Sequence, residues 1–204
     1  MITNVYIDGM NLFYRSLKGT PYKWLDLVAL SRILLPNDTI RIVRYFTAKV
    51  IDNPRNPGTH QRQNTYLRAL GTLPEIRVHL GHFRQDRVRM PVASPPPNTI
   101  EVIKTEEKGS DVNLATYLML DAFDGRCEQQ LVITNDADLA EPIRVVRQRL
   151  RRPVGIVNPT SSGRRTTRLQ GDFFLQVTPS MLAGGQLPAS LKDARGPFSK
   201  PSDW

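Results

Sequence analysis

Four aspartates stand at points where an apolar, strand-like run gives way to a helical pattern. Asp8 follows VYI, Asp111 opens the helical stretch after EEKGS, and Asp136 and Asp138 follow LVIT. In open α/β folds, residues directly after a strand lie at the carboxyl edge of the sheet, where ligands bind. Carboxylates gathered there repel each other unless a cation lies between them, and such oxygen ligands suit Mg²⁺ or Mn²⁺. We therefore predict a divalent-metal site formed by these four residues, called the acidic cluster below.

Each of these aspartates has a simpler explanation, because aspartate favours helix N-termini and turns in any fold. Three separate junctions that all end in aspartate favour the metal site over that explanation. Asp138 either contacts the metal, directly or through water, or caps the following helix. Asn11 either binds phosphate or a metal-bound water, or closes the turn after Asp8. Lys108 precedes Asp111 by three positions and either holds the scissile phosphate or is a solvated lysine.

The segment DGMN at residues 8–11 resembles the opening motif of the NYN family, a branch of the PIN-like nucleases. EEKGSDVNLA and TNDADLAEPI are similar to its middle and third motifs, in the same order, and GTPYKWLDL resembles its LabA-like bacterial branch. The resemblance implies a Rossmann-like three-layer α/β/α sandwich with a mostly parallel sheet, divalent-metal dependence and hydrolysis of RNA phosphodiesters. By match to the motifs, the acidic cluster becomes catalytic and metal-binding, with Asn11 as a polar helper. Tyr117 departs from the pattern, because many members carry an aspartate at that position.

Hydrolysis of a phosphodiester needs an activated water and neutralisation of charge on the phosphate oxygens, and one or two metal ions do both. The sequence therefore predicts a metal-dependent ribonuclease. One alternative is an RNA-binding protein with little catalysis, which the intact acidic cluster disfavours. The other is an oxidoreductase acting on a hydroxylated pyridine, as assigned to a relative in the same bacterial subgroup. The chain has no G-x-G-x-x-G after a strand, no two-histidine-one-carboxylate pattern and no flavin motif, which disfavours that reading.

Composition limits the partners. The chain has 204 residues, 40% of them hydrophobic, which is enough for one substantial core. A net charge of +9 and a pI near 10.0 favour RNA, single-stranded or structured, as the polyanionic partner. No apolar stretch reaches the roughly 20 residues that span a bilayer, so we expect a cytoplasmic protein with no membrane partner. A homodimer is left open, and the single Cys127 excludes an internal disulfide.

One group of arginines follows the last predicted core strand. Because that strand ends at the carboxyl edge of the sheet, the group should lie on the same side as the acidic cluster. We therefore expect it to contact the phosphate backbone. It consists of Arg164, Arg165 and Arg168. Tyr14, Tyr22 and Trp24 could stack on bases, although Trp24 suits the core better.

Apolar runs alternate with helical patterns, which predicts a βαβ arrangement in one domain over residues 1–182, followed by an extended tail over 183–204. The expected strands are Asn4–Ile7, Ile40–Val50, Ile76–Phe83, Thr99–Lys104, Gln130–Thr134 and Val154–Val157. The expected helices are Asn11–Leu17, Leu25–Leu35, Thr59–Leu70, Asp111–Phe123 and Leu139–Leu150, with short helical pieces at Asp172–Val177 and Pro179–Leu182. Arg84–Thr99 contains a proline triplet and is expected to be an excursion or a hairpin loop.

Overall fold

A seven-stranded sheet forms the centre of the molecule. The computed structural model describes residues 1–204 except 53–55, 95–97, 161–165 and 203. The strand order is β4-β3-β2-β1-β5-β6-β7, and neighbouring strands run parallel except for the antiparallel pair β3 and β4. The strands are β1 (Ile2–Asp8), β2 (Thr39–Ala48), β3 (Ile76–Pro91), β4 (Thr99–Lys108), β5 (Gln129–Ile133), β6 (Val154–Asn158) and β7 (Phe173–Gln176).

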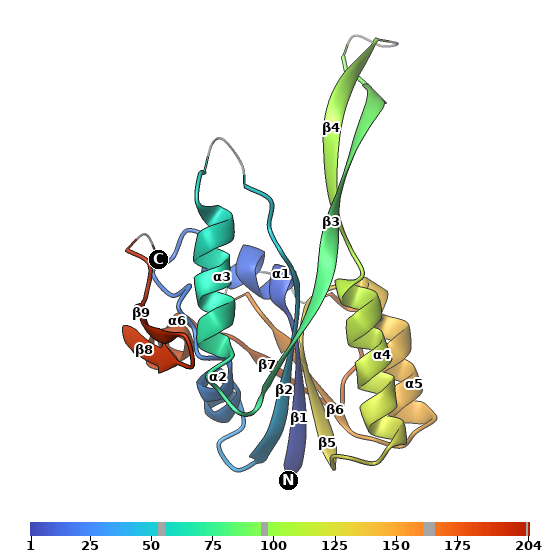
Figure 1. The fold of residues 1–204 in the computed structure, drawn as a ribbon. Coiled ribbons are helices and arrows are strands. Elements are labelled where there is room, and N and C mark those ends of the chain that lie inside the picture. The colour runs from blue at the N-terminus through green and yellow to red at the C-terminus, as the bar shows by residue number, and fades with distance from the viewer. Residues whose placement is uncertain (53–55, 95–97, 161–165, 203) are drawn as a thin grey trace.

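Helices cover both faces of this sheet. In Figure 1, α2 (Leu27–Leu34) and α3 (Thr59–Leu70) lie on one side, and α4 (Ser110–Phe123) and α5 (Ala140–Gln148) lie on the other. The remaining helical elements are α1 (Gly9–Leu12), the π-helix η1 (Phe13–Leu17), the 3₁₀-helix η2 (Ala137–Leu139) and α6 (Pro179–Gly184). This arrangement confirms the predicted α/β class with a mostly parallel sheet, and it is consistent with three layers.

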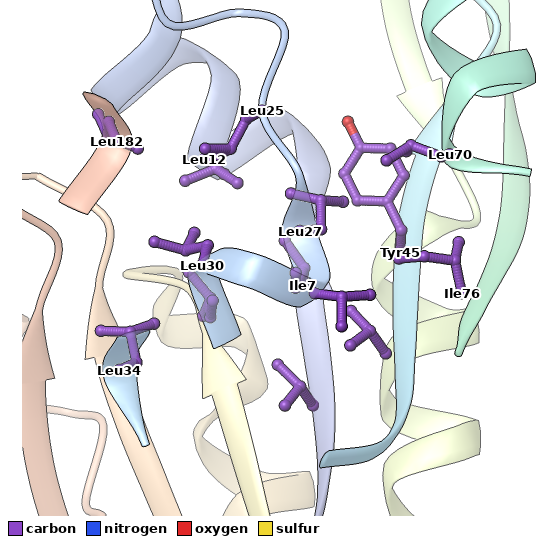
Figure 2. Packing of buried hydrophobic residues seen from close by; sticks show 14 of the residues in the cluster. Ile7, Leu12, Leu25, Leu27, Leu30, Leu34, Tyr45, Leu70, Ile76 and Leu182 are labelled. Atoms are coloured by element: carbon purple, nitrogen blue, oxygen red, sulfur yellow. The ribbon is translucent and has the colours of Figure 1, made fainter. Parts of the chain in front are cut away.

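The core consists of two apolar clusters, one on each face of the sheet. Figure 2 shows the larger one, where Ile7 of β1 packs beneath Leu27 and Leu30 of α2. All residues of β1 from Thr3 onward are buried, as are those of β5 and β6. Such continuous burial is typical of parallel strands that are covered on both faces. Because β1 lies between β2 and β5, its last residue, Asp8, reaches the middle of the sheet edge.

The segment Arg84–Thr99, predicted as an excursion or a hairpin loop, belongs to a hairpin whose strands are longer than expected. Strand β3 does not end at Phe83 but continues to Pro91, and β4 extends four residues beyond the predicted Lys104. The two strands pair from His82↔Lys108 to Pro91↔Thr99 and form a ribbon that projects from the body (Figure 1). The proline triplet on which that prediction rested, residues 95–97, lies outside the described residues, and Pro91 stands at the end of its strand, where a missing N–H is tolerated.

Two further predictions differ from the structure near the C-terminus. Residues 173–176 were expected to be helical, but they pair in parallel with β6 as strand β7. The segment 183–204 was expected to run extended, but it contains a hairpin of β8 (Ser190–Asp193) and β9 (Gly196–Ser199). The chain then returns Trp204 to the core, with its ring 5.3 Å from that of Tyr66.

Other predictions hold closely. Helix α3 has the predicted bounds, and α6 begins at Pro179 as expected. Among the residues that the structure describes, none belongs to a helix long and apolar enough to cross a membrane.

Candidate functional site at the carboxyl edge of the sheet

Asp8 occupies the centre of the site. Its side chain is 5% exposed, and both carboxylate oxygens accept a hydrogen bond. Oδ1 accepts from the backbone N–H of Asn11 at 2.9 Å, and Oδ2 accepts from the Thr134 hydroxyl at 2.9 Å. A Cβ on Gly9 would lie 2.6 Å from the Phe46 carbonyl oxygen, so only glycine lets the chain turn here against β2. Asp8 is thus held rigidly and acts as the N-cap of α1.

The loop after β5 is tied to the same point. Thr134 Oγ1 accepts from the Asp136 N–H at 3.0 Å, and Asp136 Oδ1 accepts from the Asp138 N–H at 3.0 Å. Asn11 Oδ1 accepts from the Asn135 N–H at 3.1 Å. The Asn11 side chain therefore joins the loops after β1 and β5, while its backbone closes the turn at Asp8. Sequence reasoning missed Thr134 and Asn135, although both are polar residues directly after an apolar strand.

Asp111 reaches the site from the far edge of the sheet, in the first turn of α4. Gly109, with φ of +97°, is the N-cap residue of α4. The Glu107 carboxylate supplies the capping acceptor, taking hydrogen bonds from the Ser110 N–H (3.1 Å) and hydroxyl (2.7 Å). A Cβ on Gly81 of β3 would lie 2.5 Å from the Lys108 carbonyl oxygen. This close approach folds the β4–α4 junction back over β3 and towards β1.

The carboxylates of the acidic cluster influence one another. The pKa of Asp8 is raised to about 6: burial raises it most and the charges of Asp111 and Asp136 raise it as well, while the hydrogen bonds from Asn11 and Thr134 lower it. Burial also raises the pKa of Asp111, with contributions from Asp136, Glu107 and Asp138. The structure therefore brings the four predicted aspartates into one negative region. An unpaired buried carboxylate of this kind is stabilised by a proton or a cation.

A divalent cation at this site would have few ligands from the described residues. Among the residues that the structure describes, no three Asp, Glu, His or Cys side chains are arranged to hold a metal together. Mg²⁺ does not need such a cage, because it keeps several waters and is bound through one or two carboxylates and substrate phosphates. Each carboxylate oxygen of Asp8 accepts one hydrogen bond, from Asn11 or from Thr134, and can still accept another or bind a cation.

Of Lys108, Arg164, Arg165 and Arg168, which were predicted to contact phosphate, the structure describes Lys108 and Arg168. The Lys108 ammonium lies 3.0 Å from the Glu106 carboxylate and is half-exposed. Arg168 is exposed, while Thr166, two residues earlier, donates its N–H to Asn135 Oδ1 at 2.7 Å and so ties this loop to the site. Arg164 and Arg165 lie outside the described residues.

Tyr117 replaces the aspartate that the motif resemblance suggested. Its ring lies 4.5 Å from the Arg44 guanidinium and 4.1 Å from the His79 ring. Arg44 in turn binds Asp121 with two hydrogen bonds of 2.8 Å. The position therefore belongs to a buried polar network beside β1 and β2, and an aspartate there would be a second carboxylate close to Asp121.

The raised pKa of Asp8 predicts a pH effect on stability. Well below pH 4 the carboxyl is protonated in both the folded and the unfolded state. As pH rises from about 4 to 6, the unfolded state ionises first, so the folded state loses about 3 kcal/mol of relative stability. His79, whose pKa burial lowers to about 4, acts in the opposite direction over the same range, because its folded form stays neutral.

The variant Asp8→Asn separates the contribution of Asp8 to the pH dependence of stability from that of His79. We expect the metal-free variant and the metal-free wild type to have similar stability near pH 4. At pH 7 the variant should be more stable by about 3 kcal/mol. Urea unfolding in EDTA at several pH values measures this difference. If the free energies of unfolding of the two proteins changed with pH in parallel, the raised pKa of Asp8 would be contradicted.

Comparisons with known proteins give two findings and one absence. The chain is 31% identical over 234 residues to the 6-hydroxy-3-succinoylpyridine 3-monooxygenase HspA of Pseudomonas putida, covering 99% of this chain and 75% of that protein. It resembles the crystal structure of a protein of unknown function, VPA0982 from Vibrio parahaemolyticus, with a TM-score of 0.53 and 15% identity. That match covers 91% of this chain and 95% of the other, and it supports the fold alone. No protein-family model matches the chain.

Proposed function

We propose that this chain, which belongs to the family of the 6-hydroxy-3-succinoylpyridine 3-monooxygenase HspA, is a divalent-metal-dependent ribonuclease with a PIN-like arrangement of its acidic cluster. The observation that carries the proposal is that Asp111 and Asp136, half-buried and from two other segments, lie close enough to the buried Asp8 to raise its pKa. A buried carboxylate beside other carboxylates is costly unless it has a function that uses a cation. The net charge of +9 supports RNA as the partner.

The residues of the site would divide the work as follows. Asp8 and Asp136 hold Mg²⁺ or Mn²⁺, and Asn11 and Thr134 keep the Asp8 carboxylate in position. When bound, the ion supplies an activated water and neutralises charge on the phosphate. Asp111, with a raised pKa, takes up the proton from the attacking water, since a base works best when its pKa approaches the working pH.

A second function, an oxidoreductase acting on a hydroxylated pyridine, is favoured by the activity for which the relative is named and by the length of the match. A monooxygenase needs dioxygen and a source of electrons. The chain carries no G-x-G-x-x-G motif after a strand that would indicate a dinucleotide site. We therefore rank this function below hydrolysis.

One set of assays compares the two functions. Purified protein is incubated with labelled single-stranded RNA in Mn²⁺, Mg²⁺ or EDTA. The same protein is incubated with 6-hydroxy-3-succinoylpyridine, dioxygen and a reduced nicotinamide, with and without added flavin. We expect RNA cleavage that depends on the metal and stops in EDTA. Oxidation of the pyridine without any RNA cleavage would replace the proposal by the second function.

A further inference from the structure

We propose that the cleft beside the acidic cluster binds a nucleotide base of single-stranded RNA, which deepens the proposed function and rests on it. The cleft has a volume of about 690 Å³ and lies between α1 with η1, α3 and the base of the β3–β4 ribbon. This volume falls within the range of roughly 300–1,000 Å³ that is typical of ligand sites. Its aromatic lining consists of Phe13, Tyr14, Tyr45, Tyr66, Phe83 and Trp204.

The cleft and the acidic cluster are adjacent. Gly9, which lines the cleft, directly follows Asp8 in the chain. A Cβ on Gly9 would lie 2.6 Å from Cε2 of Tyr45, so the Tyr45 ring packs directly against this junction. A base held in the cleft would therefore leave the neighbouring phosphodiester close to the Asp8 carboxylate.

The rings differ in how much they are exposed. Tyr45 and Tyr66 are buried and stand edge to face with centroids 6.4 Å apart, and the Tyr66 hydroxyl donates to the Leu25 carbonyl at 2.8 Å. These two buried rings form a rigid part of the cleft wall. Tyr14, by contrast, is 58% exposed and packs edge to face on Phe13 at 5.4 Å. An aromatic ring that is held by its neighbour and exposed to the cleft offers a surface for base stacking.

Trp24, also considered for stacking, is excluded by its surroundings. It is 1% exposed, and its indole N–H donates to the Pro188 carbonyl at 2.9 Å. The sequence-based choice of Trp24 for the core is therefore confirmed, and Tyr14 is the candidate that the fold places on the cleft.

The charges around the cleft favour a ligand that is anionic as well as aromatic. Among the described residues of its lining, Lys18, Lys23 and Arg62 are basic and Asp52 alone carries a carboxylate. The Lys18 ammonium lies 5.1 Å from the centroid of the Tyr14 ring, so a cation and a stacking surface stand side by side. A nucleotide carries both matching features, a planar base and a phosphate. The volume leaves room for more than one ring, which favours a strand of RNA over a small aromatic acid.

The test measures binding separately from cleavage. A fluorescent single-stranded oligouridylate is titrated with protein in EDTA, where no metal supports turnover, and anisotropy gives the affinity. Tyr14→Ala should weaken binding about 5- to 100-fold, which corresponds to the loss of one base stack. Tyr14→Phe should retain wild-type affinity because it keeps the ring. Phe123→Ala is the matched control, since Phe123 is a 78% exposed ring on α4 and does not line the cleft.

The outcomes distinguish this proposal from the proposed function. Equal affinities of Tyr14→Ala and wild type would overturn the base-binding cleft. Displacement of the RNA by 6-hydroxypyridine-3-carboxylate but not by uridine monophosphate would also overturn it, in favour of a small aromatic acid. If Tyr14→Ala weakens binding while wild type cleaves no RNA in Mn²⁺, the cleft stands and the ribonuclease proposal fails.

Discussion

Replacing Asp8 by asparagine should reduce metal-stimulated RNA cleavage by at least about 100-fold. Loss of a residue that only orients a metal ligand commonly costs 10- to 100-fold, so loss of a central ligand should cost more. The variant keeps the local hydrogen bonds, because an asparagine oxygen can accept from the Asn11 N–H while its amide donates to Thr134 Oγ1. The loss should therefore come from the missing charge and not from a change in fold.

Asp136→Asn should have the same effect, since its oxygen can still accept from the Asp138 N–H. Asp124→Asn provides the matched control, because Asp124 is an exposed aspartate at the far end of α4, paired with Arg126. Initial rates with labelled RNA in saturating Mn²⁺, together with circular dichroism, give the comparison. Wild-type rates in either site variant would show that the acidic cluster is not the catalytic centre.

Replacing Asp121 by alanine should lower the free energy of unfolding by about 3–5 kcal/mol. Asp121 is 1% exposed and accepts hydrogen bonds from Arg44 at 2.8 Å, from the Tyr6 hydroxyl at 2.8 Å and from the Asn4 amide at 3.2 Å. Without the carboxylate, the Arg44 guanidinium remains largely buried with no counter-charge. That uncompensated charge, more than the lost bonds, is the reason for the large expected effect.

Urea unfolding at pH 7 measures the Asp121 effect. The control Asp124→Ala, at the C-terminal end of the same helix, removes only an exposed ion pair with Arg126. It should lower the free energy of unfolding by about 0–1 kcal/mol. Burial alone would raise the pKa of Asp121, but the bonds from Arg44 and Tyr6 outweigh it and lower the pKa. The stabilisation by Asp121 should accordingly be present above the unfolded pKa and be lost as pH falls from there through the lower folded pKa. A similar small cost for both variants would contradict the structural role of this ion pair.

Much of the fold could be predicted from sequence because its signals are local. Helix α3 has its apolar positions at helical spacing, and the strands β1, β5 and β6 are short apolar runs between turn residues. Both kinds of pattern depend only on neighbouring residues. The four aspartates could be chosen for the same reason, since each directly follows or opens such an element.

The β3–β4 ribbon, β7 and the C-terminal hairpin required the tertiary structure. The exposed ribbon is defined by cross-strand partners, and β7 by its pairing with β6, neither of which leaves a strong local pattern. Trp204 likewise reaches the core only because the β8–β9 hairpin turns the chain back.

The sequence by itself determined which residue types could form the site: carboxylates at strand ends and helix starts, in a basic chain. Only the tertiary structure decided how they are held and charged. Asp8 meets Thr134 across 126 positions of sequence, Asn11 meets Asn135 across 124, and Asp121 meets Arg44 instead of the acidic cluster. The pKa of Asp8 rises to about 6 because burial and the charges of Asp111 and Asp136 act on it together. Burial and charge–charge distance are properties of the folded chain, since segments distant in sequence create both.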